Sequence, residues 1–207
     1  MSQKKDDQSF PHHVAVALNH IEELKLNGKH QKSINEAEKL LFENPDCVEA
    51  LEEIADNYVS LDAYDKAKKA CFRALKLNDN SYTAKYILGF IHSQKQEWKE
   101  AVKYLKNANI LHPNNPEILR CLGWAMFNSN KRTQGIVVLE RALNIDPENA
   151  LTLCDLGICY MQVKNFDKSI QLLKRALQLD PNNRRVKDCF EAANAFRDKF
   201  LGMKKAS

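Results

Sequence analysis

The feature that most restricts the fold of this chain is a repeat with a period of 34 residues. The phrase RALNIDPEN at 141–149 returns as RALQLDPNN at 175–183, and related phrases begin at Arg73 and Asn107. Glycines keep the same spacing, at Gly89, Gly123 and Gly157. A fixed period of this size is typical of repeat architectures, in which each unit is one supersecondary element that packs on the next.

Further columns of residues keep the same register. Prolines recur at Pro45, Pro113, Pro147 and Pro181, with Asp79 in the one gap. Two columns of small residues run through Ser33, Ala67, Ala101, Gly135 and Ser169, and through Ala74, Ala108, Ala142 and Ala176. The columns predict five units, at 14–47, 48–81, 82–115, 116–149 and 150–183. A solvated tail at 1–13, a capping helix at 184–203 and a short tail at 204–207 complete the expected organisation.

Each unit reads as two helices. In the fifth unit, one apolar face of a first helix is formed at helical spacing by Leu153, Leu156, Gly157 and Tyr160. The segment KNFD at 164–167 interrupts this periodicity. A second helix follows and is expected to end before Asp180 and Pro181, because proline cannot continue a helix. The small columns predict that the two helices of a unit approach each other closely.

Units 82–115 and 150–183 carry the motif most completely, through Leu88-Gly89, Trp98, Ala101, Ala108 and Pro113, and through Leu156-Gly157, Tyr160, Phe166, Ala176 and Pro181. This pattern resembles the tetratricopeptide repeat (TPR) family over residues 14–183. The resemblance implies an all-α superhelical solenoid of five helix-turn-helix units plus a C-terminal capping helix. Three departures stand out: Ile21 and Leu40 where small residues belong, Arg132 where an aromatic is usual, and Gly135 inside a second helix, where glycine costs about 1 kcal/mol relative to alanine.

The composition fits a soluble protein that can bury a core, with 44% hydrophobic and 28% charged residues. No apolar run approaches the roughly 18 residues of a membrane span, and the N-terminal residues lack the apolar stretch of a secretory signal. We therefore expect a cytoplasmic protein whose six cysteines are reduced thiols. Charge is uneven: residues 1–81 hold 11 Lys and Arg against 15 Asp and Glu, and residues 82–207 hold 20 against 12.

No pattern in the chain predicts catalysis. The sequence has no glycine-rich phosphate loop and no histidine or cysteine pair at metal-ligand spacing. Three cysteines fall near equivalent places on successive first helices, at Cys121, Cys154 and Cys189, which favours packing over metal binding. We expect no enzymatic activity, no cofactor and no metal site. Basic clusters at 99–106, 184–185 and 204–205 favour a solvated surface, with nucleic-acid binding as the weaker alternative.

The most informative surface is the face of each first helix opposite its core stripe. In TPR arrays this face lines the concave groove. In the second unit it is acidic and forms a predicted lip of Glu49, Glu52, Glu53 and Asp56. From the third unit onward it turns apolar and aromatic, giving a predicted partner-binding groove of Tyr86, Ile87, Phe90, Arg120, Trp124, Phe127, Leu151, Ile158 and Met161, continued by Cys121 and by Phe196 in the capping helix. An exposed apolar patch of this kind usually marks a partner site.

The carboxylate clamp of TPR co-chaperones, which holds acidic heat-shock chaperone tails, is not expected here. It needs Lys and Asn at unit positions 5 and 9, where this chain has Leu18/Glu22, Glu52/Asp56, Tyr86/Phe90, Arg120/Trp124 and Cys154/Ile158. The sequence instead predicts a scaffold or adaptor for an apolar or amphipathic, partly basic peptide or helix. In surface character it resembles TPR chaperones and assembly factors. Self-association through the same face, and internal packing of that face, are the alternatives.

Overall fold

The computed structural model describes residues 11–205, and within this part of the chain it contains eleven helices and no strand. The helices are α1 (His12–Leu26), α2 (His30–Glu43), α3 (Val48–Ser60), α4 (Tyr64–Leu77), α5 (Tyr82–Gln94), α6 (Trp98–Leu111), α7 (Pro116–Asn128), α8 (Arg132–Ile145), α9 (Ala150–Gln162), α10 (Phe166–Leu179) and α11 (Arg184–Lys205). The prediction of an all-α fold made of helix pairs is confirmed.

The predicted tails fall mostly outside the described residues. Residues 1–10 and 206–207 belong to them, so nothing tests the tails there. Helix α1 begins at His12, inside the predicted N-terminal tail, and α11 continues to Lys205, past the predicted end of the capping helix. Each of the five predicted units otherwise contains one helix pair, and α11 follows the fifth.

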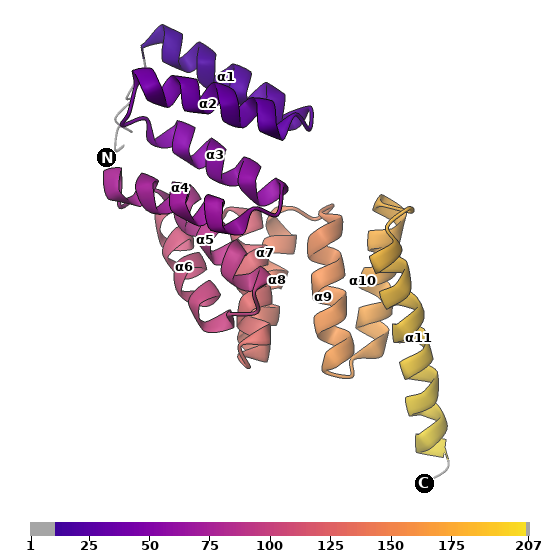
Figure 1. The fold of residues 1–207 in the computed structure, drawn as a ribbon. Coiled ribbons are helices and arrows are strands. Elements are labelled where there is room, and N and C mark those ends of the chain that lie inside the picture. The colour runs from indigo at the N-terminus through magenta and orange to yellow at the C-terminus, as the bar shows by residue number, and fades with distance from the viewer. Residues whose placement is uncertain (1–10, 206–207) are drawn as a thin grey trace, which may run out of the picture. The chain divides into compact units, whose positions relative to one another are not determined.

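The chain divides into two compact units, residues 1–91 and residues 92–207, and the division falls within α5. From here on, 'first unit' and 'second unit' mean these two parts, and the repeats are called helix pairs. In the first unit, α1, α2, α3 and α4 lie side by side, each packed on the next (Figure 1). In the second unit the same holds for the succession from α6 to α11. Contacts between neighbours in the chain dominate both units, as expected for a repeat architecture.

The repeated phrase marks where each first helix begins. Its last residue caps the next helix: the side chain of Asn115 accepts hydrogen bonds from the backbone N–H groups of Glu117 and Ile118, both at 3.0 Å. Asn149 and Asn183 repeat this one and two periods later, and Ser81 does so with its hydroxyl one period earlier. Asn and Ser are preferred at this position because their side-chain oxygen pairs an otherwise unsatisfied donor.

The turn inside each pair also repeats. The backbone adopts a left-handed conformation at five positions 34 residues apart: Gly28, Asp62, Gln96, Asn130 and Lys164. In each turn the next backbone N–H donates to the carbonyl five residues before it, at 2.8 to 3.0 Å, which closes the end of the first helix. Only one of the five residues is glycine, so in the other four helix pairs a residue with a side chain adopts a backbone conformation that side chains disfavour.

The helices of the fourth predicted unit touch through their backbones. A Cβ atom added to Gly135 would lie 2.6 Å from the carbonyl oxygen of Gly123 and 2.6 Å from the backbone nitrogen of Phe127. A Cβ on Gly123 would in turn lie 2.7 Å from Cγ of Leu139. The expectation that Gly135 is a destabilising departure was therefore wrong, because the close contact between α7 and α8 requires a residue without a side chain.

The first pair accommodates larger residues and adds a polar network. Ile21 and Leu40 are both buried in the core. The hydroxyl of Ser33, on α2, donates to the carbonyl of Ile21 at 2.9 Å and accepts from the side-chain amide of Asn57, on α3, at 2.9 Å. Asn57 also lies 3.0 Å from Nδ1 of His30. Since Ser33 and Asn57 are fully buried, these hydrogen bonds satisfy polar groups that would otherwise be costly.

Gly135→Ala is expected to lower the free energy of unfolding by about 1–3 kcal/mol, because the added methyl group overpacks a backbone contact. Gly202→Ala is the matched control, since nothing lies within 4 Å of its Cβ position in α11 and alanine favours the helix. Urea denaturation measures both variants. Equal stability of the two would contradict the close contact.

Lys164→Gly is expected to raise the free energy of unfolding by about 0.5–1 kcal/mol, because glycine adopts the left-handed turn without strain. Gly28→Lys, at the equivalent position of the first pair, should have the opposite sign. Thermal and urea unfolding of the two variants test this, and a loss of stability in Lys164→Gly would refute the reading of the turn.

Candidate functional site

The candidate site is the first-helix face, which we define as the side of α3, α5, α7, α9 and α11 opposite their core stripes. In the first unit this face begins with the four carboxylates of the predicted lip on α3. Lys25 of α1 pairs with two of them, since its Nζ lies 2.8 Å from Oε2 of Glu53 and 3.1 Å from Oδ2 of Asp56. Glu52 accepts a hydrogen bond from the hydroxyl of Ser81 at 2.6 Å, and Glu49 accepts one from the Cys47 thiol at 3.8 Å.

The lip is therefore less negative than its sequence suggests. Lys25 compensates part of the charge, and the two carboxylates raise the pKa of Lys25 although burial opposes this. Burial raises the pKa of Glu52, against the effect of its hydrogen bond from Ser81. The lip thus acts partly as an internal connection between α1 and α3.

On α5, the three predicted groove residues differ in accessibility. Tyr86 and Phe90 are half-buried, whereas Ile87 is buried with 2% of its surface exposed. Ile87 therefore belongs to the core of the structure and does not line an open surface.

In the second unit, two predicted groove residues also lie in the core. Phe127 of α7 is 2% exposed and packs with Leu139 and Leu156, and Ile158 of α9 is 8% exposed and packs with Leu153. Cys121 is buried as well. These side chains pack in the core with residues of neighbouring helices, so they do not line an open surface.

Four side chains on this face of the second unit remain accessible. Trp124 and Met161 are half-buried and pack against the core around Ile158. Leu151, at the start of α9, and Phe196, on α11, are 52% and 53% exposed. Large apolar side chains at this exposure keep apolar surface in contact with water, and a bound partner would stabilise the complex by covering that surface.

An ion-pair network crosses the same face. Arg120 of α7 binds Glu117 on its own helix, with Nε 2.9 Å from Oε2, and reaches Asp155 of α9 with Nη1 at 2.7 Å from Oδ2. Arg185 of α11 lies 3.7 Å from the other oxygen of Asp155, and its guanidinium stands 6.0 Å from the ring of Trp124. The network connects three successive first helices.

Burial sets the electrostatics of this network. It raises the pKa of Asp155 above its ordinary value, and the charge and hydrogen bond of Arg120 act in the opposite direction. The Asp155 side chain is only 6% exposed and that of Arg120 14%. A carboxylate buried this deeply depends on its cationic partner, because an unpaired charge in such a place is costly.

Five of the six cysteines are buried, and Cys189 is partly buried. Burial raises the pKa of Cys71, Cys121 and Cys154 to about 12, so these thiols stay protonated at neutral pH. Within residues 11–202, no cluster of three or more His, Cys, Asp or Glu side chains could hold a metal ion. All six cysteines are free thiols.

The sequence interpretation did not include Arg185 or Glu117 in the site. Both stand in the column of Leu151, one period to either side of it, so the register itself contained the signal. Asn57 was also missed, because a buried asparagine in a helix leaves no periodic pattern.

Over the described part of the chain, no helix is both long enough and apolar enough to span a membrane.

Comparison with known proteins matches this chain to two family models and to solved structures of similar fold. Residues 2–152 match the family model of the tetratricopeptide repeat protein 21 C-terminal ARM domain, and residues 150–183 match that of the tetratricopeptide repeat. The search of curated protein sequences gives no match.

Among solved structures, the chain is similar to YrrB, a TPR protein with an unusual peptide-binding site, at 20% identity over 84% of this chain and 90% of that one, with a TM-score of 0.63. A thermophilic TPR protein of Thermus thermophilus, TTC0263, shares 16% identity over 88% and 99%, with a TM-score of 0.73. The APC/C hetero-tetramer Cut9-Hcn1 gives a TM-score of 0.81 at 21% identity, over 89% of this chain but only 37% of that one. At these identities the similarity establishes the fold.

Arg120→Ala is expected to lower the free energy of unfolding by about 3–5 kcal/mol, because it leaves Asp155 buried without its closest cation. The control is Lys39→Ala, which removes an ion pair with Glu36 whose side chains are 72% and 38% exposed and should change the stability little. Urea titrations compare the two. A loss in Arg120→Ala no larger than that in the control would show that the network contributes little.

Proposed function

Because this chain belongs to the tetratricopeptide repeat family, in the branch of the protein 21 C-terminal ARM domain, we propose that it is a non-catalytic scaffold that binds an apolar or amphipathic segment of another protein. The family fold generally serves protein–protein interaction. The proposed contact surface is the accessible part of the first-helix face in the second unit: Trp124, Leu151, Met161 and Phe196, with Arg185 at its edge. Tyr86 and Phe90 on α5, in the first unit, stay a separate prediction.

One observation carries this proposal. Leu151 and Phe196 expose more than half of their surface on a face that also holds a half-buried tryptophan. The charges beside them are already paired within the chain, through Arg120, Asp155 and their neighbours. A partner therefore gains chiefly by covering apolar surface, which does not require it to supply charge.

The chemistry of the ligand follows from the same contacts. YrrB, which shares the fold, has an unusual peptide-binding site, and a peptide or short helix is the ligand that we propose here. The sequence predicted a partly basic partner because of the acidic lip. Since Lys25 compensates Glu53 and Asp56, we give basic residues of the ligand a secondary role. A chaperone or assembly role remains a prediction from surface character.

The proposal also covers the location of the protein in the cell and the absence of a carboxylate clamp. We propose a cytoplasmic location, which the six free thiols support, since reduced cysteines are typical of that compartment. We also retain the absence of a carboxylate clamp, because the clamp positions hold other residues, such as Phe90 and Trp124.

The double variant Leu151→Glu/Phe196→Glu tests the proposed surface. Immobilised wild-type chain and the variant are compared by affinity capture from native lysate with mass spectrometry. Wild type is expected to retain a protein that the variant loses at least tenfold, because two carboxylates now oppose apolar contact. Recovered candidates are then titrated against purified chain.

The matched control is Ile110→Glu/Val137→Glu, which places the same charges on exposed residues of the second helices α6 and α8. Capture by this control should equal that of wild type. Equal capture by both double variants would refute the proposed surface. Loss of a larger particle size in the Leu151→Glu/Phe196→Glu variant alone, by size-exclusion chromatography with light scattering, would support the alternative of self-association through this face.

A further inference from the structure

A separate pocket of about 300 Å³ lies in the first unit between α2, α3 and α4. Its lining comprises Glu38, Leu41, Leu51, Ile54, Tyr58, Lys66, Lys69, Ala70 and Arg73. The apolar members of this set are almost fully buried, with Leu41, Leu51 and Ile54 at 7%, 2% and 6% exposure. These side chains form the apolar floor of the pocket because they line its volume, although each presents little open surface of its own. The pocket belongs to other helices than the proposed binding face of the second unit.

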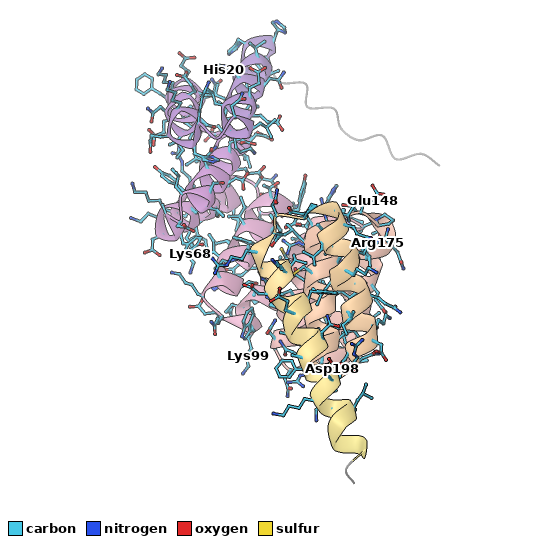
Figure 2. The ribbon with its side chains drawn as sticks, turned by 90° about the vertical axis from the view of Figure 1, so that its right-hand side faces the viewer. His20, Lys68, Lys99, Glu148, Arg175 and Asp198 are labelled. Atoms are coloured by element: carbon cyan, nitrogen blue, oxygen red, sulfur yellow. The ribbon has the colours of Figure 1, made fainter. Side chains whose placement is uncertain are left out.

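The rim of the pocket is cationic. Lys66, Lys69 and Arg73 follow one another at helical spacing on α4, and all three are exposed. Nη2 of Arg73 donates to the carbonyl of Pro45 at 3.0 Å, and Nζ of Lys66 stands 5.3 Å from the centre of the Tyr58 ring. Both contacts are with uncharged groups, and the lining holds one carboxylate, that of Glu38, which offsets part of the positive charge. Figure 2 labels Lys68, which adds a further positive charge on the same helix.

A matching ligand carries a large apolar side chain with carboxylates around it. The first unit contains such a segment at the end of α2. Phe42 is 89% exposed, the highest value among the large hydrophobic residues that the structure describes. Glu38 stands one turn before it, and Glu43 and Asp46 follow it, all three of them exposed. A ring this exposed gains the full burial of an aromatic side chain when a partner covers it.

We propose that a second copy of this chain occupies the pocket, with Phe42 of each copy inserted into the pocket of the other. Glu38 lines the pocket and shares a helix face with Phe42, so the ring and the pocket lie next to each other on α2. Adjacent donor and acceptor features permit a two-fold arrangement in which both contacts form at once. Glu43 and Asp46, which follow Phe42 and do not line the pocket, then meet the cations around the partner copy's pocket, which favours this orientation.

Sedimentation velocity of the full chain, from micromolar to millimolar concentration, tests the proposal. Wild type is expected to shift from monomer to dimer, more weakly at high salt because the rim charges are screened. Phe42→Ser and Lys69→Glu should each weaken the association at least tenfold. The matched control is Phe72→Ser. Phe72 is also an exposed phenylalanine, but it lies on α4 and outside the pocket lining, so this variant should leave the association unchanged. Circular dichroism confirms that each variant is folded.

Three results would overturn the proposal: a monomer at every concentration, equal weakening by Phe42→Ser and Phe72→Ser, or a dimer that only Leu151→Glu/Phe196→Glu dissociates. A fluorescein-labelled peptide of residues 36–47 gives one further outcome. Binding of this peptide to a monomeric wild type, with loss in Lys69→Glu, would overturn the dimer and assign the pocket to an acidic aromatic segment of another protein. None of these results alters the capture experiment on the second unit, so the two proposals fail separately.

Discussion

Close contact between paired helices is the constraint on which the rest of the structure depends. Gly123 and Gly135 let the backbones of α7 and α8 touch, and Gly157 meets the side chain of Leu173 in the next pair. The columns of small residues keep the same place in each predicted repeat, the recurring left-handed turns separate the helices of each pair, and side-chain caps begin the first helices α5, α7, α9 and α11. Because the pairs form in the same way, each can pack on its neighbour within its compact unit, which gives each unit a core of its own.

The same packing decides what the first-helix face can offer a partner. It covers Phe127 and Ile158, leaves Trp124 half-buried, and exposes Leu151 and Phe196. The ion pairs around Asp155 join α7, α9 and α11 beneath this surface. They pair charges that would otherwise attract a ligand, so in the function that we propose a partner gains chiefly by covering apolar surface.

The sequence predicted the fold well because the decisive signals are periodic. Proline, glycine and alanine columns located the helix pairs, and they did so without knowledge of any contact. It predicted the site less well, because a helical wheel gives a direction but not the neighbour that lies there, which is why Phe127 was expected at the surface. The left-handed turns at Gln96 and Lys164 were invisible for another reason: their neighbours impose the conformation, and the residues themselves do not favour it. At Gly135 the column of small residues predicted the close helix contact, but helix propensity alone suggested a cost, because propensity takes no account of the backbone that lies opposite.

We propose that the chain binds its partner through the accessible first-helix face of the second unit. Hydrogen–deuterium exchange of the chain, with and without the partner that wild type captures, tests this. We expect amide protection to rise in α7, α9 and α11 and to stay unchanged in α8 and α10. A rise confined to α8 and α10 would place the partner on the second helices and contradict the proposed surface.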